Sequence, residues 1–281
     1  MSTPDLAAWV GRTESRAERI GEGPVATLSV TLDREDPAPQ DGDPVPPLWH
    51  WLYFLPRFPL AEAGPDGHAA RGGFLPPVPL PRRMWAGGRV EFRQPLNIGD
   101  TATRTSRIVN VSEKSGRSGP LVFVLVRHEI ARDGDTLIVE EHDIVYREAP
   151  NTGAPESPRP APAERAWSRE IHPDPVLLFR YSALTFNSHR IHYDHPYVTR
   201  VEGYPDLIVH GPLIATLLVD LLRRHRPDAT VASFDFRAVS PLFANHPFQV
   251  CGQPEMDGGV RLWAQRIDGA LAMEATARLR A

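Results

Sequence analysis

The sequence predicts an α+β protein built from two copies of one unit, and three observations lead to this prediction. The chain has 281 residues, enough for one large core or two modest ones. A proline-rich segment, residues 150–162, has almost no apolar bulk and reads as a linker near the middle of the chain. On both sides of it the same patterns follow in order: a strand, a Pro-Leu pair, a second strand and an Asp-Gly hairpin.

The N-terminal part of the first copy contains one expected helix and one ambiguous segment. Residues 4–19 show an amphipathic pattern preceded by Thr3, so we expect a helix capped by Thr3. Residues 48–55 form a short aromatic-rich segment whose type the pattern leaves open. The chain has 30 prolines, and many of them cluster in residues 37–47 and 76–81, which predicts loops there.

Matching strands are expected in the two copies. Residues 89–93 and residues 233–237 each alternate apolar and polar side chains, which is typical of a half-buried strand. The pair Pro95-Leu96 follows the first strand, and Pro241-Leu242 follows the second. Because several such matches occur in register, duplication explains them better than chance does.

Each copy is expected to end in a β-hairpin. An Asp-Gly pair between two alternating runs favours a tight turn that needs positive φ. The runs are residues 121–130 and 136–146 around Asp133-Gly134, and residues 260–267 and 270–279 around Asp268-Gly269.

The clearest helix covers residues 212–224. Pro212 suits a first helical turn, the next residues are apolar almost all round, and Pro227 ends the segment. A helix without a polar face should be buried, and an antiparallel sheet wrapped round it gives the hotdog arrangement. The sequence therefore predicts a double hotdog, with a first unit over residues 1–149, a linker over 150–165 and a second unit over 166–281.

Composition excludes several classes of protein. The formal net charge is −4, so nothing favours nucleic acid as a partner. The single cysteine, Cys251, excludes an internal disulfide and a cysteine-rich metal site. No apolar stretch reaches the ~18 residues that a membrane span needs, and the N-terminus lacks a signal-peptide pattern. We therefore expect a cytoplasmic protein that does not bind membranes.

Residues 181–194 and 209–212 carry the strongest sign of chemistry. They place Asn187, His189 and His192 ahead of a helix that Gly211 opens. Imidazoles move protons near neutral pH, and the start of a helix offers free N–H groups to an anionic oxygen. This combination predicts an enzyme that performs acid–base chemistry next to a carbonyl group.

These residues resemble a known signature. The MaoC-like (R)-specific enoyl-CoA hydratases and hydroxyacyl-thioester dehydratases carry D-x-N-P-x-H, followed by a helix opened by H-G. The signature histidine falls on His192 and the helix-opening pair on His210-Gly211, whereas Asn187 stands where the family has aspartate. His189 and Arg190 replace the N-P pair, which resembles the branch of type 2 hydroxyacyl-thioester dehydratases and mesaconyl-C4-CoA hydratases.

The resemblance is specific over residues 181–217 and loose over residues 82–100. It implies reversible hydration and dehydration of an enoyl or 3-hydroxyacyl thioester, bound to CoA or to a carrier protein, with a mesaconyl or similar short acyl group. No cofactor besides the thioester substrate is expected. We predict that His192 is the acid/base, that Asn187 positions water, and that the N–H of Gly211 polarises the thioester carbonyl.

A second proton carrier is needed because an amide such as Asn187 cannot accept a proton at neutral pH. His189 and Asp194 are the local candidates, and Asp194 could instead orient an imidazole, as carboxylates do in triads. His189, His192 and His195 could share a helix face and bind a metal. Pro196 interrupts that stretch and no second acidic segment supports it, so no metal is expected.

Residues for substrate binding are less sharply defined. Arg190 and Arg200 are candidates for the CoA phosphates, and Arg82, Arg83 or Arg190 could pair with a second carboxylate on the acyl group. Three further candidates have competing structural roles: His210 as a helix-entry packing residue, Tyr181 as a strand end, and Trp85 in a loop-like Trp-Ala-Gly-Gly run.

Two other functions remain open. A hotdog thioesterase would typically use a carboxylate base or nucleophile, and the amide at Asn187 counts against it. A non-catalytic acyl-thioester binding module would not need the histidine cluster. In the favoured hydratase interpretation the first unit has lost its proton-transfer residues and only shapes the pocket, so each chain has one site. A homodimer is possible.

Overall fold

The computed structural model describes residues 5–116, 119–148 and 158–280. Its strands are β1 (Thr13–Arg19), β2 (Arg82–Phe92), β3 (Thr101–Gly116), β4 (Gly119–Arg132), β5 (Asp135–Arg147), β6 (Trp167–Ile171), β7 (Val231–Ala238), β8 (Phe248–Pro254), β9 (Gly259–Arg266) and β10 (Leu271–Leu279). Its helices are α1 (Glu22–Thr31), α2 (Pro175–Leu184), α3 (His195–Arg200) and α4 (Gly211–His225). Short 3-10 turns are η1 (Leu6–Trp9), η2 (Trp49–Leu52), η3 (Leu60–Glu62) and η4 (Arg190–His192).

One antiparallel sheet contains all the strands above and confirms the internal duplication. Its strand order is β1-β3-β4-β5-β2-β7-β10-β9-β8-β6. Read from each edge inward, the two halves have the same order, so β1 corresponds to β6, β3 to β8, β4 to β9, β5 to β10 and β2 to β7. The predicted hairpins are β4–β5 and β9–β10. Two equivalent five-stranded units therefore share one sheet, as the repeated patterns predicted.

The two units join where the matching predicted strands meet. β2 pairs with β7 in antiparallel register, with Val90 opposite Phe234 and Gly88 opposite Phe236. A Cβ atom on Gly87 would lie 2.6 Å from the carbonyl oxygen of Phe236, so only glycine fits this close approach of the strands. The run from Trp85 to Gly88 is therefore strand rather than the predicted loop, and a register shift beside Trp85 marks a bulge.

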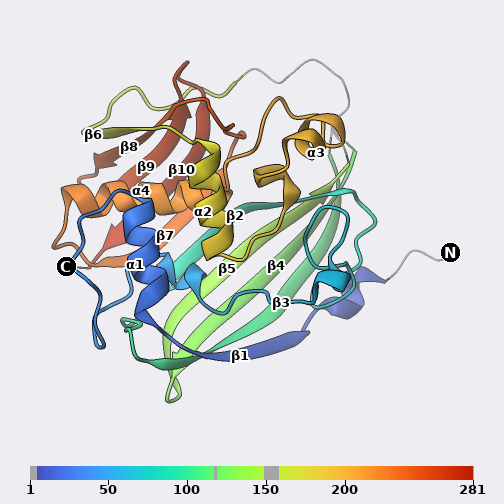
Figure 1. The fold of residues 1–281 in the computed structure, drawn as a ribbon, viewed down its shortest axis with the longest axis horizontal. Helices are drawn as coiled ribbons and strands as arrows, with labels where there is room; N and C mark the ends of the chain where they lie inside the picture. Colours follow the sequence, from blue (N-terminus) through green and yellow to red (C-terminus); the bar gives the residue numbers. More distant parts are fainter. Residues whose placement is uncertain (1–4, 117–118, 149–157, 281) are drawn as a thin grey trace.

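Helix α4 fills the second unit, as predicted. It contacts β6, β8, β9 and β10, and in Figure 1 it lies across these strands. Leu213 to Leu222 are all buried, including Asp220 near the C-terminal end. The Asp220 carboxylate pairs with Arg34, Arg169 and Arg224 at 2.6, 3.0 and 2.7 Å, so its burial is compensated by three cations. The bulk of the hydrophobic core is gathered around this helix.

The first unit is filled differently. Its helix α1 is short and contacts α2, beside which it stands in Figure 1. The segment between η2 and β2 crosses the faces of β3, β4 and β5 (Figure 1). Val78 and Leu80 of this segment pack on Ile108, Val124 and neighbouring apolar residues to form a separate small core. No long helix covers these strands among the described residues, which leaves interior space in this unit.

Besides the loop expected at Trp85, two sequence predictions about local structure were wrong. Residues 5–19 do not form one helix: η1 is followed by strand β1, which alternates exposed and half-buried residues and pairs with β3. The glutamate, alanine and arginine content of β1 favours helix, and pairing with β3 overrides this propensity. Tyr181 is not a strand end, because it lies in α2, capped by the Asp174 side chain.

Other predictions fall at the edge of the described chain. Thr3 and residues 149–157 lie outside the described residues. The end of the predicted linker runs beside the β9–β10 hairpin, where Leu271 N–H donates to the carbonyl oxygen of Arg159. Among the helices that the structure describes, none has the length and apolar character to cross a membrane.

Candidate active site

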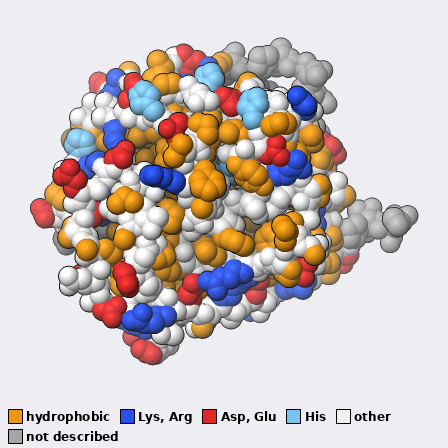
Figure 2. Space-filling model, in the orientation of Figure 1, with side chains coloured by type: hydrophobic (Ala, Val, Ile, Leu, Met, Phe, Trp, Pro, Cys, Tyr) orange, Lys and Arg blue, Asp and Glu red, His pale blue; other side chains and the backbone are white. Residues whose placement is uncertain are grey.

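A cavity of about 730 Å³ lies between the two units and receives side chains from both. The second unit contributes α2, the segment that follows it, and the start of α4. The first unit contributes the segment between η2 and β2 and the inner faces of β2 to β5. On the face shown in Figure 2, apolar side chains gather in the middle of the molecule with basic side chains beside them. The cavity borders the faces of β2 to β5, which no long helix covers among the described residues of the first unit.

His192 lines this cavity in a single neutral form. Its Nδ1 lies 2.7 Å from the carbonyl oxygen of Ile208, which can only accept, so Nδ1 carries the proton and Nε2 is free to accept one. Burial, together with nearby His189, lowers the pKa of His192 to about 3, against the hydrogen bond to Ile208. The ring is therefore neutral near pH 7 and presents a basic nitrogen.

His210 packs against the ring of His192. The two rings stack with centroids 3.7 Å apart and planes 19° apart. His210 Nε2 lies 2.8 Å from the hydroxyl oxygen of Ser182, a residue of α2, and the side chain is fully buried. His210 does not line the cavity, so of the two predicted roles the structure supports packing rather than substrate contact.

Gly211 is the first residue of α4 and lines the cavity. A Cβ atom at this position would meet only the carbonyl oxygen of Trp85, at 4.0 Å, so the space beside Gly211 is open. The first N–H groups of a helix have no partner within the helix and carry partial positive charge. The start of α4 can therefore hold an oxygen atom that becomes negative during a reaction.

Asn187 and His189 follow α2 and also line the cavity. The Asn187 side-chain oxygen accepts a hydrogen bond from the backbone N–H of His189 at 3.0 Å, which leaves the amide N–H groups of Asn187 to donate elsewhere. The rings of His189 and His192 are perpendicular, with centroids 5.5 Å apart. Burial and the charge of Arg83 lower the pKa of His189 to about 3, so it too is neutral near pH 7.

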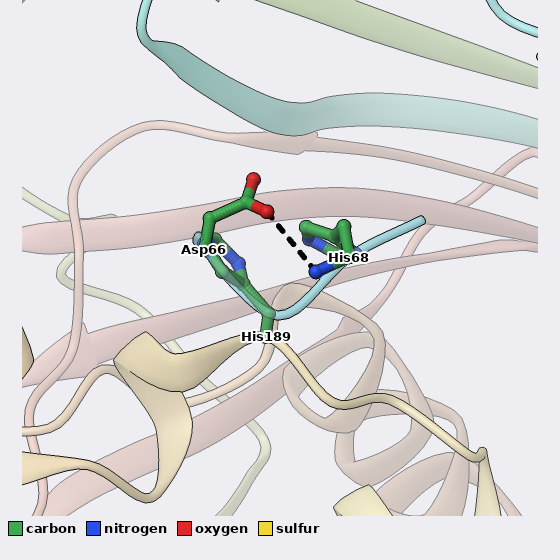
Figure 3. Close-up of side chains that lie close together, drawn as sticks. All are labelled: Asp66, His68 and His189. Carbon is green, nitrogen blue, oxygen red and sulfur yellow. Dashed lines mark hydrogen bonds between the residues drawn. The ribbon is translucent and has the colours of Figure 1, made fainter. Parts of the chain in front are cut away.

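The first unit adds two residues that the sequence analysis missed, Asp66 and His68. Both line the cavity, and the ring centroids of His68 and His189 are 4.3 Å apart. Figure 3 shows Asp66 and His68 on their loop with His189 reaching toward them from the second unit. The first unit therefore brings two titratable side chains to the cavity, beside the residues that shape it. The one available signal was the Pro65-Asp-Gly turn directly before His68.

A polar network forms part of the cavity wall in the first unit. Glu140 is buried, and its carboxylate lies 2.5 Å from His142 Nε2, 3.1 Å from His50 Nε2 and 2.7 Å from Trp51 Nε1. Burial alone would raise the pKa of Glu140, but the charge and hydrogen bond of His142, with those of His50, outweigh it and hold the pKa well below its usual value. The network fixes His142, whose ring lies 4.0 Å from that of Trp85.

Several arginines line the cavity, and Arg83 and Arg104 are among those that have no ion-pair partner in the part of the chain that the structure describes. Arg82 pairs with Glu202 at 3.1 Å and lies over the Tyr204 ring. Arg83 and Arg104 line the cavity without a carboxylate within ion-pair distance. The charge of Arg83 reaches both His68 and His189, whose pKa values it lowers after the larger effect of burial. An anionic group in the cavity would find uncompensated positive charge here.

Of the predicted site residues, the structure brings eight to the cavity: Tyr181, Asn187, His189, His192, Gly211, Trp85, Arg82 and Arg83. Three others lie elsewhere besides His210. Asp194 accepts from Tyr197 N–H at the start of α3 and pairs with Arg190 at 2.8 Å. Arg190 also lies over the Tyr197 ring, and Arg200 ends α3. Because Asp194 is held by these partners, it is poorly placed to exchange protons with His192.

A metal site at His189, His192 and His195 is not formed, because His195 does not line the cavity and lies 3.7 Å from Asp206. A different set of donors does converge: Asp66, His68 and His189 each offer one ligand atom within 4.8 Å of the other two. Two imidazoles and a carboxylate are a donor set that could hold a divalent cation. The nearby charge of Arg83 opposes a second cation at this place.

Comparison with known proteins finds a family model that matches this chain and a protein with a similar sequence. Residues 48–244 match the family model described as hydroxyacyl-thioester dehydratase type 2. The chain is 50% identical to the mesaconyl-C(4)-CoA hydratase of Chloroflexus aurantiacus, over 99% of each chain.

Solved structures support the fold. The HtdX protein of Mycobacterium tuberculosis superposes with a TM-score of 0.66 at 19% identity, covering 96% of this chain and all of that one. Another Mycobacterium tuberculosis protein, described as having a double hotdog fold, superposes with a TM-score of 0.56 at 14% identity and 96% coverage of each chain. The predicted double hotdog is confirmed.

Proposed function

Because this chain belongs to the hydroxyacyl-thioester dehydratase type 2 family, we propose that it hydrates an enoyl thioester, and dehydrates the 3-hydroxyacyl product, at the cavity around His192. It is a hydro-lyase acting on acyl thioesters, in agreement with its hydratase relative. The observation that carries the assignment of the site is His192, which is neutral, held in one tautomer by Ile208 and placed in a cavity with the start of α4.

In the hydration direction His192 acts as the base. Its Nε2 takes a proton from water while the water oxygen bonds to the β-carbon of the enoyl group, and the electron pair of the double bond moves toward the thioester oxygen. Transfers of this kind typically contribute ~10²–10⁴ in rate. The lowered pKa of His192 keeps its ring unprotonated before the reaction. Negative charge that develops on the substrate opposes this depression and stabilises the protonated ring.

The start of α4 holds the developing enolate oxygen. The N–H of Gly211 is the proposed donor, because the space beside it is open and no side chain blocks the approach of a ligand. Donors fixed before the reaction stabilise such charge more than water does, since they need no reorganisation. Asn187 positions the water: its oxygen is occupied by His189 N–H, so an amide N–H of Asn187 donates to one lone pair of a bound water and leaves the other lone pair to attack the substrate.

The substrate is a short acyl group that carries a second carboxylate, as in the mesaconyl thioester named for the Chloroflexus relative. The first-unit wall of the cavity supports this choice, because Arg104, His128 and His142 would be poor neighbours for a long alkyl chain. In a mesaconyl-C4 thioester the free carboxylate is attached to the carbon that receives the hydroxyl group. Its partner must therefore lie near the catalytic histidines, and Arg83 meets this condition.

No cofactor takes part in this proposal, since water addition needs only proton transfer and an oxygen site. CoA is the proposed thiol carrier. Pairing of two chains remains a prediction that sedimentation analysis of the purified protein would check.

The test is turnover of mesaconyl-C4-CoA by the purified chain, followed through loss of absorbance of the conjugated thioester. Crotonyl-CoA, which lacks the second carboxylate, is the matched comparison, and we expect a much lower kcat/KM for it. Release of free thiol, detected with a thiol reagent, would instead indicate thioester hydrolysis. Tight binding of both thioesters without any turnover would indicate a binding module.

A further inference from the structure

The reaction proposed above leaves one group unassigned. Hydration moves two protons: one leaves water and one arrives at the α-carbon. The family signature has an aspartate where this chain has Asn187, whose amide cannot carry a proton. Asp194, the nearest carboxylate in sequence to the signature histidine, is held by Arg190 and by the start of α3 outside the cavity. His189 is the remaining local candidate, and any groups that position it must come from elsewhere in the fold.

Asp66 and His68 lie next to His189 at the cavity. The carboxylate of Asp66 and one ring nitrogen each of His68 and His189 lie within 4.8 Å of one another, and all three residues line the cavity. One Asp66 oxygen accepts a hydrogen bond from the backbone N–H of His68 at 3.1 Å, drawn as the dashed line in Figure 3. His189 in turn lies beside His192. His192, His189, His68 and Asp66 therefore form a continuous row of side chains that ends at a carboxylate.

The loop that carries Asp66 is built to dock on the signature segment. Arg190 N–H donates to the carbonyl oxygen of Asp66 at 2.9 Å, and the Ser188 hydroxyl donates to that of Gly67 at 2.5 Å. The Arg190 guanidinium donates to the carbonyl oxygen of Pro65 at 2.9 Å. These bonds flank His189 on both sides in sequence and fix its position relative to Asp66.

Gly67 makes the docking possible. Its φ is +89°, and a Cβ atom there would lie 2.0 Å from the carbonyl oxygen of Ser188, so no other residue fits without displacing the loop. A loop that only covered the cavity would not need so close an approach at this position. The contact indicates that Asp66 and His68 are placed against His189 with defined geometry.

We propose, on the basis of the function assigned above, that Asp66, His68 and His189 form a second proton-transfer centre that the first unit supplies to the active site. His189 is the catalytic residue of this centre, and His68 and Asp66 are positioning residues. The proton that His192 takes from water passes to His189, where the Asp66 carboxylate stabilises the imidazolium. It then moves to the α-carbon as the enolate electrons return, so that one water is added and both histidines end neutral.

The experiment compares His189→Gln, His68→Gln and Asp66→Asn with His195→Gln, an exposed histidine outside the cavity, as the matched control. Each variant is assayed as the full chain for hydration of mesaconyl-C4-CoA, with the thermal unfolding midpoint as the check on folding. A second readout is the exchange of the α-hydrogen of the hydroxyacyl product with deuterated water, measured by mass spectrometry. It reports proton transfer at carbon separately from loss of the hydroxyl group.

We expect His189→Gln to lower kcat about 10²-fold or more with a smaller change in KM, and to slow α-hydrogen exchange in parallel. His68→Gln and Asp66→Asn should lower kcat about tenfold, because a misplaced proton carrier loses rate, and should displace the acidic limb of the pH–rate profile. His195→Gln should behave as wild type.

Wild-type kcat, exchange rate and pH profile in both His68→Gln and Asp66→Asn would overturn the proposal. So would loss of activity on chelation with recovery on adding zinc, since the three residues would then hold a metal ion. Failure of the proposed function gives a different result, because the wild-type chain would then turn over none of the thioesters.

Discussion

The two units of this protein share a strand order and differ in what fills them. In the second unit α4 packs against β6, β8, β9 and β10, and its residues Leu213 to Leu222 are all buried in the core. In the first unit the corresponding sheet face borders the cavity, and His142 and Trp51, both bonded to buried Glu140, form part of its wall. Duplication thus allowed one copy to keep the core while the other became a binding pocket.

The comparison also separates two kinds of histidine. His192 and His189 belong to the second unit and project into the shared cavity, whereas His142 and His128 belong to the first unit and form its wall. His142 is tied to buried Glu140, and His128 Nδ1 lies 2.8 Å from the Ser106 hydroxyl oxygen. The variants below test how far the chemistry belongs to the second unit and the selection of substrate to the first.

The largest effect should come from the second unit. His192→Gln removes the base that Ile208 holds in one tautomer, and we expect kcat for hydration to fall by about 10²–10⁴. The loss of conjugated absorbance measures it. The dissociation constant of a saturated acyl-CoA, measured by calorimetry, should stay within about threefold of wild type. This is a small change in binding free energy, because a tenfold change corresponds to ~1.4 kcal/mol. Equal turnover in the variant would remove His192 from the mechanism.

The next effect tests the contact between the units. Gly67→Ala should lower kcat by about 10²-fold, because its Cβ would lie 2.0 Å from the Ser188 carbonyl oxygen and displace the loop from His189. Gly42→Ala is the matched control: φ there is +94°, but no atom lies within 4 Å of the added Cβ. It should lose stability of about 1 kcal/mol through backbone strain and keep its kcat. Similar kcat losses in both variants would assign the effect to backbone strain alone.

A smaller and selective effect should follow from Arg83→Gln in the first unit. We expect kcat/KM for mesaconyl-C4-CoA to fall about tenfold to a hundredfold, the size of one lost charge-assisted hydrogen bond. Crotonyl-CoA has no second carboxylate, so its kcat/KM should change little. Arg82→Gln provides the comparison, because Arg82 is already paired with Glu202. Parallel losses for both thioesters would instead indicate that Arg83 binds the CoA portion.

The smallest effect concerns how the free energy of unfolding depends on pH. The pKa values of His189 and His192 are about 3 in the folded chain and near ~6.5 when unfolded, so between these values the unfolded state binds more protons. The free energy of unfolding should therefore fall as the pH drops from ~6.5 toward 3, by up to about 1.4 kcal/mol per pH unit for each histidine. Urea titrations at several pH values should show a shallower slope for His192→Gln. An unchanged slope would contradict this account.

The sequence could predict the second unit better than the first because the patterns that identify the second unit are local in sequence. The apolar run of α4, the Asp268-Gly269 turn and the spacing of Asn187, His189 and His192 each lie within a short stretch of chain. The partners of His189 do not: Asp66 and His68 are far away in sequence, and only the folded loop brings them together. The helix predicted over residues 4–19 failed for a related reason, since pairing of β1 with β3 decides that segment.

The Ser188–Gly67 contact also bears on engineering by recombination. Exchanging the first unit for that of a relative is an obvious way to alter which acyl group is accepted, because that unit supplies the pocket wall. Such a chimaera would retain His192 and α4 intact, yet it would lose its fit around His189 unless residues 64–68 travelled with the second unit. A working chimaera should therefore keep residues 64–68 together with the second unit, and a single exchange at the proline-rich junction would not do this.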